Sequence, residues 1–254
     1  MKRNILISTM ALIAGSLLAA ESSPKDAVSN AVKKLAGGTY AFTITTTNAA
    51  GGFGGGGGGG GRGPGAGMNA PLEGKVSKDG IAYVVRTAGG STNEAAAKGA
   101  KIALKTQDGW QTMEEMMNGG GGFGGGGGGG MGLFAMMSLV VPASQAEEVV
   151  GKVKELKLAD GVYSGDLTAD GAKSLASPFP GFGGGGGGPE INGAKGSVKF
   201  WVKDGVLSKY ELHTQGSMDF GGNEMAIDRT TTVEIKDAGK TDVTVPEEAK
   251  KKVS

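Results

Sequence analysis

The chain has 254 residues, of which 52 are glycine and none is cysteine, and its formal net charge is +1. Proline is scarce and no Gly-x-y period exists, which excludes a collagen-like structure. The lack of cysteine excludes disulfides and a lipid-modified N-terminal cysteine. Removal of residues 1–20 would leave a charge of −1, which gives no electrostatic reason to expect nucleic acid or an anionic membrane surface as a partner.

Residues 1–20, MKRNILISTMALIAGSLLAA, predict a signal peptide. Lys2 and Arg3 form a charged start, residues 5–18 are apolar, and small residues precede the polar ESS. An N-terminal membrane anchor is the alternative, but this apolar run is shorter than the roughly 20 residues that a span needs. We therefore expect cleavage after Ala20 and a periplasmic or extracellular protein without a stable transmembrane anchor.

The first half of the mature chain predicts one helix and several strands. SSPKDAVSNAVKKLAGG has Ser23 as the N-cap and Pro24 at the first helical position. TYAFTITTT alternates like a strand, and AKIALKTQDGW predicts another strand before a short helix in WQTMEEMMN. PLEGKVSKDGIAYVVRTA predicts a hairpin about Asp79-Gly80 with a two-residue loop. That register would place these residues on one face: Leu72, Val76, Ile81, Tyr83 and Val85.

The second half predicts two helices followed by long strands. SQAEEVVGKVKELK has Ser144 as N-cap with Glu147 completing a capping box, and GVYSGDLTADGAKSLAS predicts a short strand and a helix capped by Thr168. SVKFWVKDGVLSKYELHTQGSM predicts a hairpin, for which a three-residue loop over 203–205 would pair Phe200 with Ser208. NEMAIDRTTTVEIKD predicts another strand and VPEEAKKKV a closing helix. Because the strands cluster along the chain, we expect an α+β fold in which helices pack on one face of an antiparallel sheet.

Three glycine tracts, over 51–67, 119–130 and 181–188, interrupt this pattern. All three fall at predicted junctions, where loops tolerate insertions, and we expect them to be disordered loops within a single domain over 21–254. Each tract carries one phenylalanine, and the alternative is that these rings gather at one rim and contact a membrane or a partner: Phe53, Phe123 and Phe182.

The order of elements resembles the LolA-like superfamily, which includes lipoprotein carriers and lipid-binding half-barrels of the LppX and LprG type. The resemblance is carried by FAMMSLVVPASQAEEVVGKVKELK, GSVKFWVKDGVLSKYELHTQG and TTTVEIKDAGKTDVTVPEEAKKKV. It implies a strongly curved antiparallel sheet, an incomplete barrel, with helices against its concave face and an apolar cavity that accommodates acyl chains. This chain departs from the lipoprotein members in its glycine tracts and in its lack of a modified cysteine.

Residues suited to catalysis are scarce. The chain has one histidine, His213, and no cysteine, which excludes a zinc site built from these two types and a Cys–His nucleophile pair. No glycine tract is followed by the Lys-Ser/Thr of a phosphate-binding loop. We therefore expect no catalytic residue, metal or cofactor, and no enzymatic activity.

A set of large apolar residues, with one arginine, is the candidate for ligand binding. The Met-rich segment 131–141 is suited to variable apolar partners. It and the aromatic residues of the strands form either the core or the lining and lid of a cavity: Phe42, Tyr83, Trp110, Phe134, Met136, Met137, Phe200 and Tyr210. Arg229 falls on the apolar face of its strand, where it would hold a helix or an anionic head group, unless a bulge turns it outward.

These patterns support two alternatives for function. One is a secreted binding protein that holds a lipid or lipoprotein acyl chain between the sheet and the helices. The other is a structural or interaction module of the cell envelope, with a filled core and a protein partner. A cavity between sheet and helices would favour the first alternative, and a filled core would favour the second.

Overall fold

The structure is a computed structural model. It describes residues 23–49, 71–88, 91–99, 101–118, 136, 140–177, 190–220 and 223–254. The predicted signal peptide, the three glycine tracts with their phenylalanines, and Phe134 and Met137 lie outside these residues.

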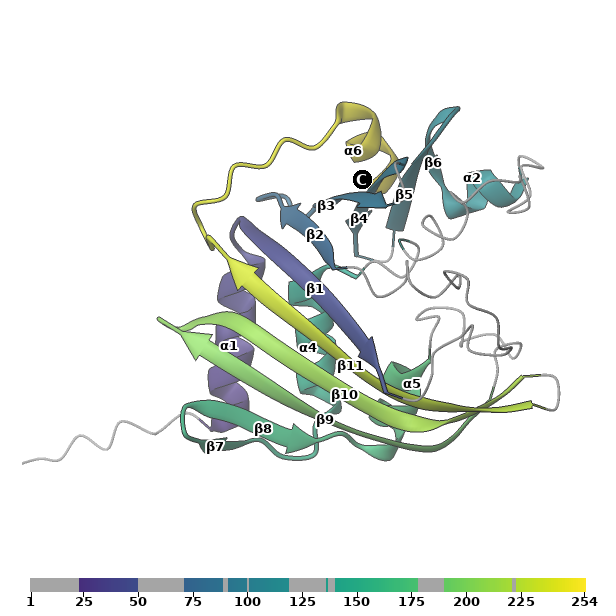
Figure 1. Cartoon of the computed structure of the whole chain (residues 1–254). Coiled ribbons are helices and arrows are strands. Elements are labelled where there is room, and N and C mark those ends of the chain that lie inside the picture. The colour runs from purple at the N-terminus through teal and green to yellow at the C-terminus, as the bar shows by residue number, and fades with distance from the viewer. Residues whose placement is uncertain are drawn as a thin grey trace, which may run out of the picture.

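Eleven strands form one sheet in the described part of the chain, and five helices accompany it (Figure 1). The strands are β1 (Tyr40–Asn48), β2 (Leu72–Val76), β3 (Ala82–Ala88), β4 (Ser91–Lys98), β5 (Lys101–Thr106), β6 (Gly109–Thr112), β7 (Lys157–Ala159), β8 (Val162–Asp166), β9 (Ile191–Lys203), β10 (Val206–Phe220) and β11 (Asn223–Lys236). The helices are α1 (Pro24–Ala36), α2 (Met113–Asn118), α4 (Pro142–Lys152), α5 (Ala169–Ala176) and α6 (Glu247–Val253).

The sheet is antiparallel throughout and does not close into a barrel. Its strand order is β6-β5-β4-β3-β2-β1-β11-β10-β9-β8-β7. One meander runs from β1 to β6 and a second from β7 to β11, and the pairing of β1 with β11 joins them into one sheet. Strands β2 to β6 bend away from the plane of β1 and β9 to β11, while α1, α4 and α5 lie together on the concave side (Figure 1). The predicted antiparallel sheet with helices on one face is confirmed in this form, with the addition that α6 packs on the outer face of β4 to β6.

Side-chain caps or a proline in the first turn mark the starts of α1, α4 and α5. In α1, the Ser23 hydroxyl accepts a hydrogen bond from the Asp26 N–H at 3.1 Å, and Val28, Val32 and Leu35 form a buried stripe. In α5, the Thr168 hydroxyl accepts from the Gly171 N–H, as predicted. The expected Ser144 cap is wrong: α4 begins earlier, with Pro142 in its first turn and Val141 as a cap without a side-chain hydrogen bond. Proline fixes φ at a helical value and needs no N–H partner there, which allows this earlier start.

The β2–β3 hairpin does not form the predicted two-residue loop, and its register is shifted by one residue from the predicted register. Val76 pairs with Ala82 instead of Tyr83, because the Ser77 N–H donates to the Ile81 carbonyl and the Ser77 hydroxyl accepts from the Ile81 N–H. The serine therefore widens the turn. A one-residue shift moves every side chain of a strand to the other face. As a result Val84 and Arg86 share the concave face with Val76, and Tyr83 and Val85 lie on the outer face.

The β9–β10 hairpin uses a two-residue loop, so the predicted three-residue loop is wrong. Lys203 pairs with Val206, and Asp204 and Gly205 both have positive φ, as a type I′ turn requires. A bulge at Ser208 then adds one residue to β10, and its hydroxyl donates to the Trp201 carbonyl at 3.0 Å. The bulge places Tyr210 opposite Phe200, so that both rings face the helices.

Candidate ligand-binding face

Four aromatic rings fill the space between the helices and the β1, β9 and β10 part of the concave face. Tyr40, Phe42, Phe200 and Tyr210 are each 0–2% exposed and belong to the main core cluster. The Tyr40 and Phe42 ring centroids are 6.4 Å apart, and those of Phe200 and Tyr210 are 6.2 Å apart. This aromatic layer makes the region beneath α1 and α4 a packed core.

The hydroxyls of the two tyrosines in this layer fix the start of α4. The Ala143 N–H donates to the Tyr40 hydroxyl at 3.2 Å, which satisfies one of the free donors of the first helical turn. The Tyr210 hydroxyl donates to Gln145 Oε1 at 2.6 Å and lies 3.3 Å from the Pro142 carbonyl. Both tyrosines therefore stabilise the first turn of α4, and their hydroxyl groups already have hydrogen-bond partners within the protein.

We expect the protein to lose stability in alkaline solution because these phenols are buried. Burial raises the pKa of Tyr40 to about 12 and the pKa of Tyr210 well above its usual value. An unfolded tyrosine ionises near pH 10, so the stabilisation is complete below pH 10 and is lost as the pH rises through about 12. The loss from Tyr40 alone is about 3 kcal/mol. Tyrosinate absorbance and circular dichroism, measured together, should change in one transition. Full ionisation of all four tyrosines near pH 10 in a protein that stays folded would contradict this.

The aromatic layer ends at β2 and gives way to small side chains. Gly74 of β2 lies beneath the Phe42 ring, and a Cβ at Gly74 would stand 2.4 Å from Phe42 Cζ and 2.8 Å from Val84 Cγ2. Beside Val84 and Ala82, the concave face of β4 carries Ala95 and Ala97, which pair with Leu104 and Ile102 of β5. We call Val84, Ala95, Ala97, Ile102 and Leu104 the alanine wall. Except for the partly buried Ile102, these residues are 0–1% exposed.

Arg86 lies at the edge of the alanine wall and was not predicted as a site residue. It follows Val84 by two residues on the concave face, pairs with Asn93 of β4, and is only 6% exposed. Its Nε and Nη2 are buried and donate to no acceptor within the described residues. A buried guanidinium without an acceptor is costly, because it loses hydration and gains no compensating charge or hydrogen bond.

Arg229, which the sequence placed on the apolar face, points inward and holds a helix. Its Nη2 donates to the Leu175 carbonyl in the last turn of α5 at 2.7 Å, and burial lowers its pKa. Thr214 lies directly opposite on β10, and its hydroxyl is buried without a partner among the described residues. Arg229 therefore satisfies a free carbonyl at a helix C-terminus, which a cation also stabilises through the helix dipole.

The other predicted site residues are divided between the two faces. Tyr83 and Trp110 lie on the outer face with their ring centroids 6.4 Å apart, in the cluster that packs against α6. The Tyr83 hydroxyl donates to Glu94, which also pairs with Lys105 at 2.6 Å. Met136 is fully buried in the main cluster, and Phe134 and Met137 are outside the described residues. The structure thus brings together Phe42, Met136, Phe200 and Tyr210 and separates Tyr83 and Trp110 from them.

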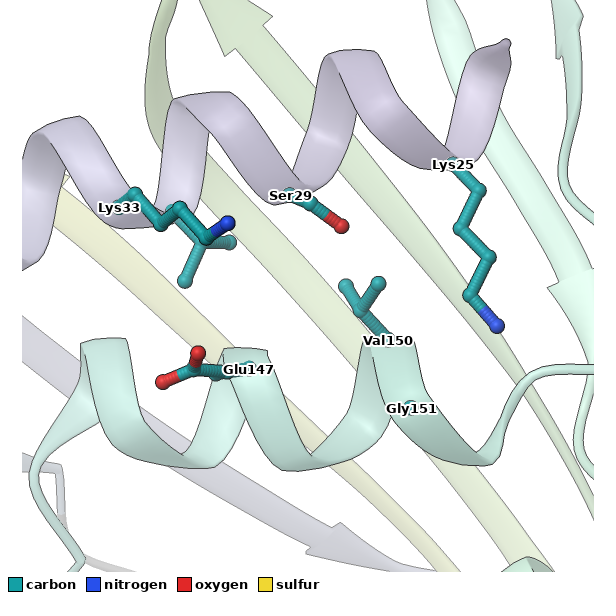
Figure 2. A pocket seen from close by; sticks show the side chains of 7 residues that line it. Lys25, Ser29, Lys33, Glu147, Val150 and Gly151 are labelled. Carbon is teal, nitrogen blue, oxygen red and sulfur yellow. The ribbon is translucent and has the colours of Figure 1, made fainter.

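Two shallow grooves of the described surface are lined by charged residues. One, of about 220 Å³, lies between α1 and α4, where Lys25, Ser29 and Lys33 face Glu147 and Val150, with the sheet behind them (Figure 2). The other, of about 360 Å³, lies between residues 154–157 and strands β8 and β9, and three lysines line it: Lys154, Lys157 and Lys199. Charged linings of this kind disfavour burial of an acyl chain.

The described residues contain no group of three or more His, Asp or Glu side chains that would hold a metal ion. His213 pairs with Asp228 at 2.8 Å on the outer face of β10 and β11, as a surface pair that lowers the pKa of Asp228. Within the described ranges, no helix has the length and apolar character needed to cross a membrane.

The described elements define an open, curved antiparallel sheet with helices on its concave face. The chain is similar to the solved structure of a LolA superfamily protein of Nitrosomonas europaea, with 8% sequence identity, a TM-score of 0.33, and coverage of 88% of this chain and 96% of that one. No protein-family model and no curated protein matches the chain. What the chain binds must therefore be inferred from its own residues.

Proposed function

We propose that the protein is a secreted, non-enzymatic binding protein that holds an apolar ligand, such as a lipid or acyl chain, against the alanine wall. The observation that carries the proposal is the change in side-chain size across the concave face. Bulky rings fill the β1, β9 and β10 part, whereas β4 presents the methyl groups of Ala95 and Ala97 there, near Arg86, two of whose nitrogens have no acceptor among the described residues. Small residues on a curved apolar surface are suited to a ligand that supplies the missing volume.

Burial of the ligand chain would provide the binding energy. Each methylene removed from water contributes about 0.8 kcal/mol, so a chain that covers the wall binds without any covalent chemistry. The wall is almost wholly buried, so a ligand must displace protein atoms from it to enter. We therefore expect uptake to be slow relative to diffusion.

The aromatic layer favours the second function, an envelope module that contacts a protein partner. A packed core beneath α1 and α4 needs no ligand to complete it. Native mass spectrometry of the mature protein, after incubation with an envelope lipid extract, distinguishes the two functions. Bound lipid supports the binding protein, and a protein that carries no lipid and takes none up contradicts it.

Enlarging one residue of the alanine wall should block ligand uptake while leaving the fold intact. We expect Ala95→Phe to abolish lipid binding, because its ring would cover the surface against which the ligand packs, and to destabilise the protein by about 1–3 kcal/mol, because Ala95 is fully buried. Ala96 is the matched control: it is also 0% exposed, but it packs in the cluster formed with α6. Overpacking costs about 1–3 kcal/mol in a filled core, so Ala96→Phe should destabilise the protein without removing binding in the fraction that is folded.

The two variants are compared by thermal melting and by native mass spectrometry with lipid extract. Both alanines are fully buried, so the decisive readout is lipid uptake by the folded fraction. Equal uptake by folded Ala95→Phe and Ala96→Phe would contradict the proposal.

A further inference from the structure

We propose that Arg86 binds the anionic head of an amphiphile, so that the ligand is an acyl or alkyl chain ending in a carboxylate or a phosphate. This inference rests on the proposed function, and it adds the class of ligand and the residue that selects it. It starts from a buried cation that has no acceptor in the described structure, next to a wall suited to a chain.

The first step is the position of Arg86 relative to the wall. Arg86 and Val84 are two residues apart on one strand, so their side chains lie on the same face. On β4, Ala95 pairs with Val84, and Asn93 pairs with Arg86. Continuing the β2–β3 register places Arg86 level with Leu72, which is partly buried against the main cluster. The guanidinium is therefore bordered by apolar groups along β3 and across β2, with the Asn93 amide as the one polar neighbour across β4.

The second step is that the charge of the guanidinium is not compensated by an acceptor among the described residues. Arginine stays charged in proteins, so burial cannot be relieved by loss of its proton. Other buried or half-buried charges in the structure do have partners: Arg229 reaches the Leu175 carbonyl, and Glu94 pairs with Lys105. Both of the buried nitrogens of Arg86, Nε and Nη2, lack such a partner among the described residues.

The third step is the geometry of the acceptor. The Nε and Nη2 atoms form one edge of the planar fork, and that edge matches two oxygens of a carboxylate or phosphate. An uncharged alcohol or ester offers a single neutral oxygen and leaves the charge uncompensated. The combination of this fork with the neighbouring alanine wall selects a ligand with one anionic end and an apolar chain.

The test compares three probes that share one alkyl chain and differ in the head group: laurate, dodecyl phosphate and dodecanol. Binding to the mature protein is measured by titration calorimetry. We expect laurate or dodecyl phosphate to bind roughly 10 to 100 times more tightly than dodecanol, as a hydrogen-bonded ion pair requires. The tighter of the two anions identifies the source of the charge as a carboxylate or a phosphate.

The variant Arg86→Met should remove the preference for anions and leave dodecanol binding within about twofold. Arg86→Gln provides a second variant that retains polarity without charge, in case the methionine variant does not fold. Lys195→Met is the control, because Lys195 is an exposed cation on the opposite face of β9. It should leave the affinity for every probe unchanged.

The outcomes separate this inference from the proposed function. If wild-type protein binds dodecanol as tightly as the two anions, or if both Arg86 variants keep the preference, the role of Arg86 is overturned while apolar ligand binding stands. If none of the three probes binds, the proposed function fails and this inference fails with it.

A stability measurement gives an independent readout. A buried cation without an acceptor destabilises the ligand-free protein, so Arg86→Met should raise its melting temperature. Saturation with the preferred anion should raise the melting temperature of the wild type more than that of the variant. A fall in the melting temperature of ligand-free Arg86→Met would show that Arg86 has a structural role, and would overturn the inference.

Discussion

Phe200→Ala is expected to destabilise the protein by about 3–5 kcal/mol. The ring is 0% exposed at the centre of the aromatic layer, opposite Tyr210 and next to Tyr163 of β8. Its removal loses the transfer free energy of a phenyl ring and leaves a cavity that the surrounding strands cannot close. For a domain of this size the melting temperature should fall by roughly 10 °C.

The neighbouring aromatic residue provides the control for Phe200→Ala. Trp201 lies on the outer face, half-buried, with the Lys209 ammonium 4.9 Å above its ring. Because an exposed cation–π contact is worth about 0.5–1 kcal/mol, Trp201→Ala should cost far less than Phe200→Ala. Thermal melts of the two variants measure the difference. Similar losses would show that the space beneath α1 and α4 is not filled by the aromatic layer.

Gly165→Ala is expected to destabilise the protein by about 3 kcal/mol. Gly165 lies on the concave side of β8 beneath the segment that leaves α4, and a Cβ there would stand 2.1 Å from the Glu155 carbonyl oxygen and 2.8 Å from Val153 Cγ1. The clash is with backbone, so a rotamer change cannot relieve it. The Lys154 N–H bond to the Asp166 carbonyl, at 2.9 Å, holds the two segments together and would be strained.

A second glycine of the same region should respond in the opposite direction. Gly151 lies within α4, and a Cβ there would meet no atom within 4 Å. Because alanine is favoured over glycine in helices, Gly151→Ala should stabilise the protein by about 1 kcal/mol. Denaturant titrations of the two glycine variants measure this contrast. Tolerance of Gly165→Ala would mean that β8 and the end of α4 are less closely packed than the structure shows.

The sequence predicted most elements and the two faces of β11 correctly. Ser23, Pro24 and Thr168 mark two helix starts through chemistry that is local to the chain. Along β11, the alternation of Met225, Ile227, Val233 and Ile235 predicted the inward face, and it also carried Arg229 inward. Strands β4, β6 and β7 were not predicted. The β4 sequence STNEAAAK lacks the β-branched and aromatic residues that signal a strand, and β6 and β7 are only four and three residues long.

The two hairpins show where local signals were insufficient. The Asp79-Gly80 dipeptide suggested a tight loop, but the Ser77 side chain stabilises a wider turn and shifts the register by one residue. In the β9–β10 hairpin the tight loop is present, and the bulge at Ser208 shifts the register so that the later apolar residues of β10 face the helices. In both cases a hydrogen bond between a serine and the backbone decides the register, and residue types alone do not indicate it.

The register of the first hairpin also explains why the candidate site differs from the predicted one. The predicted register placed Tyr83 inward, which made this residue a candidate for ligand contact. The observed register places Tyr83 against the α6 side and brings Val84 and Arg86 to the concave face instead. The signal that would have identified Arg86 is its alternation with Val84, once the turn is known to include Ser77.

The sequence by itself determined the Ser23 and Thr168 helix caps, the clustering of strands that makes the sheet antiparallel, and the scarcity of catalytic side chains. These follow from composition and from spacings of two to four residues, which act within one element. Only the tertiary structure decided which part of the concave face is filled by rings, which part presents methyl groups, and which arginine of the described residues has buried nitrogens without an acceptor. Those features depend on register and on contacts between distant strands and helices, where one hydrogen bond in a turn moves an entire strand from one face to the other.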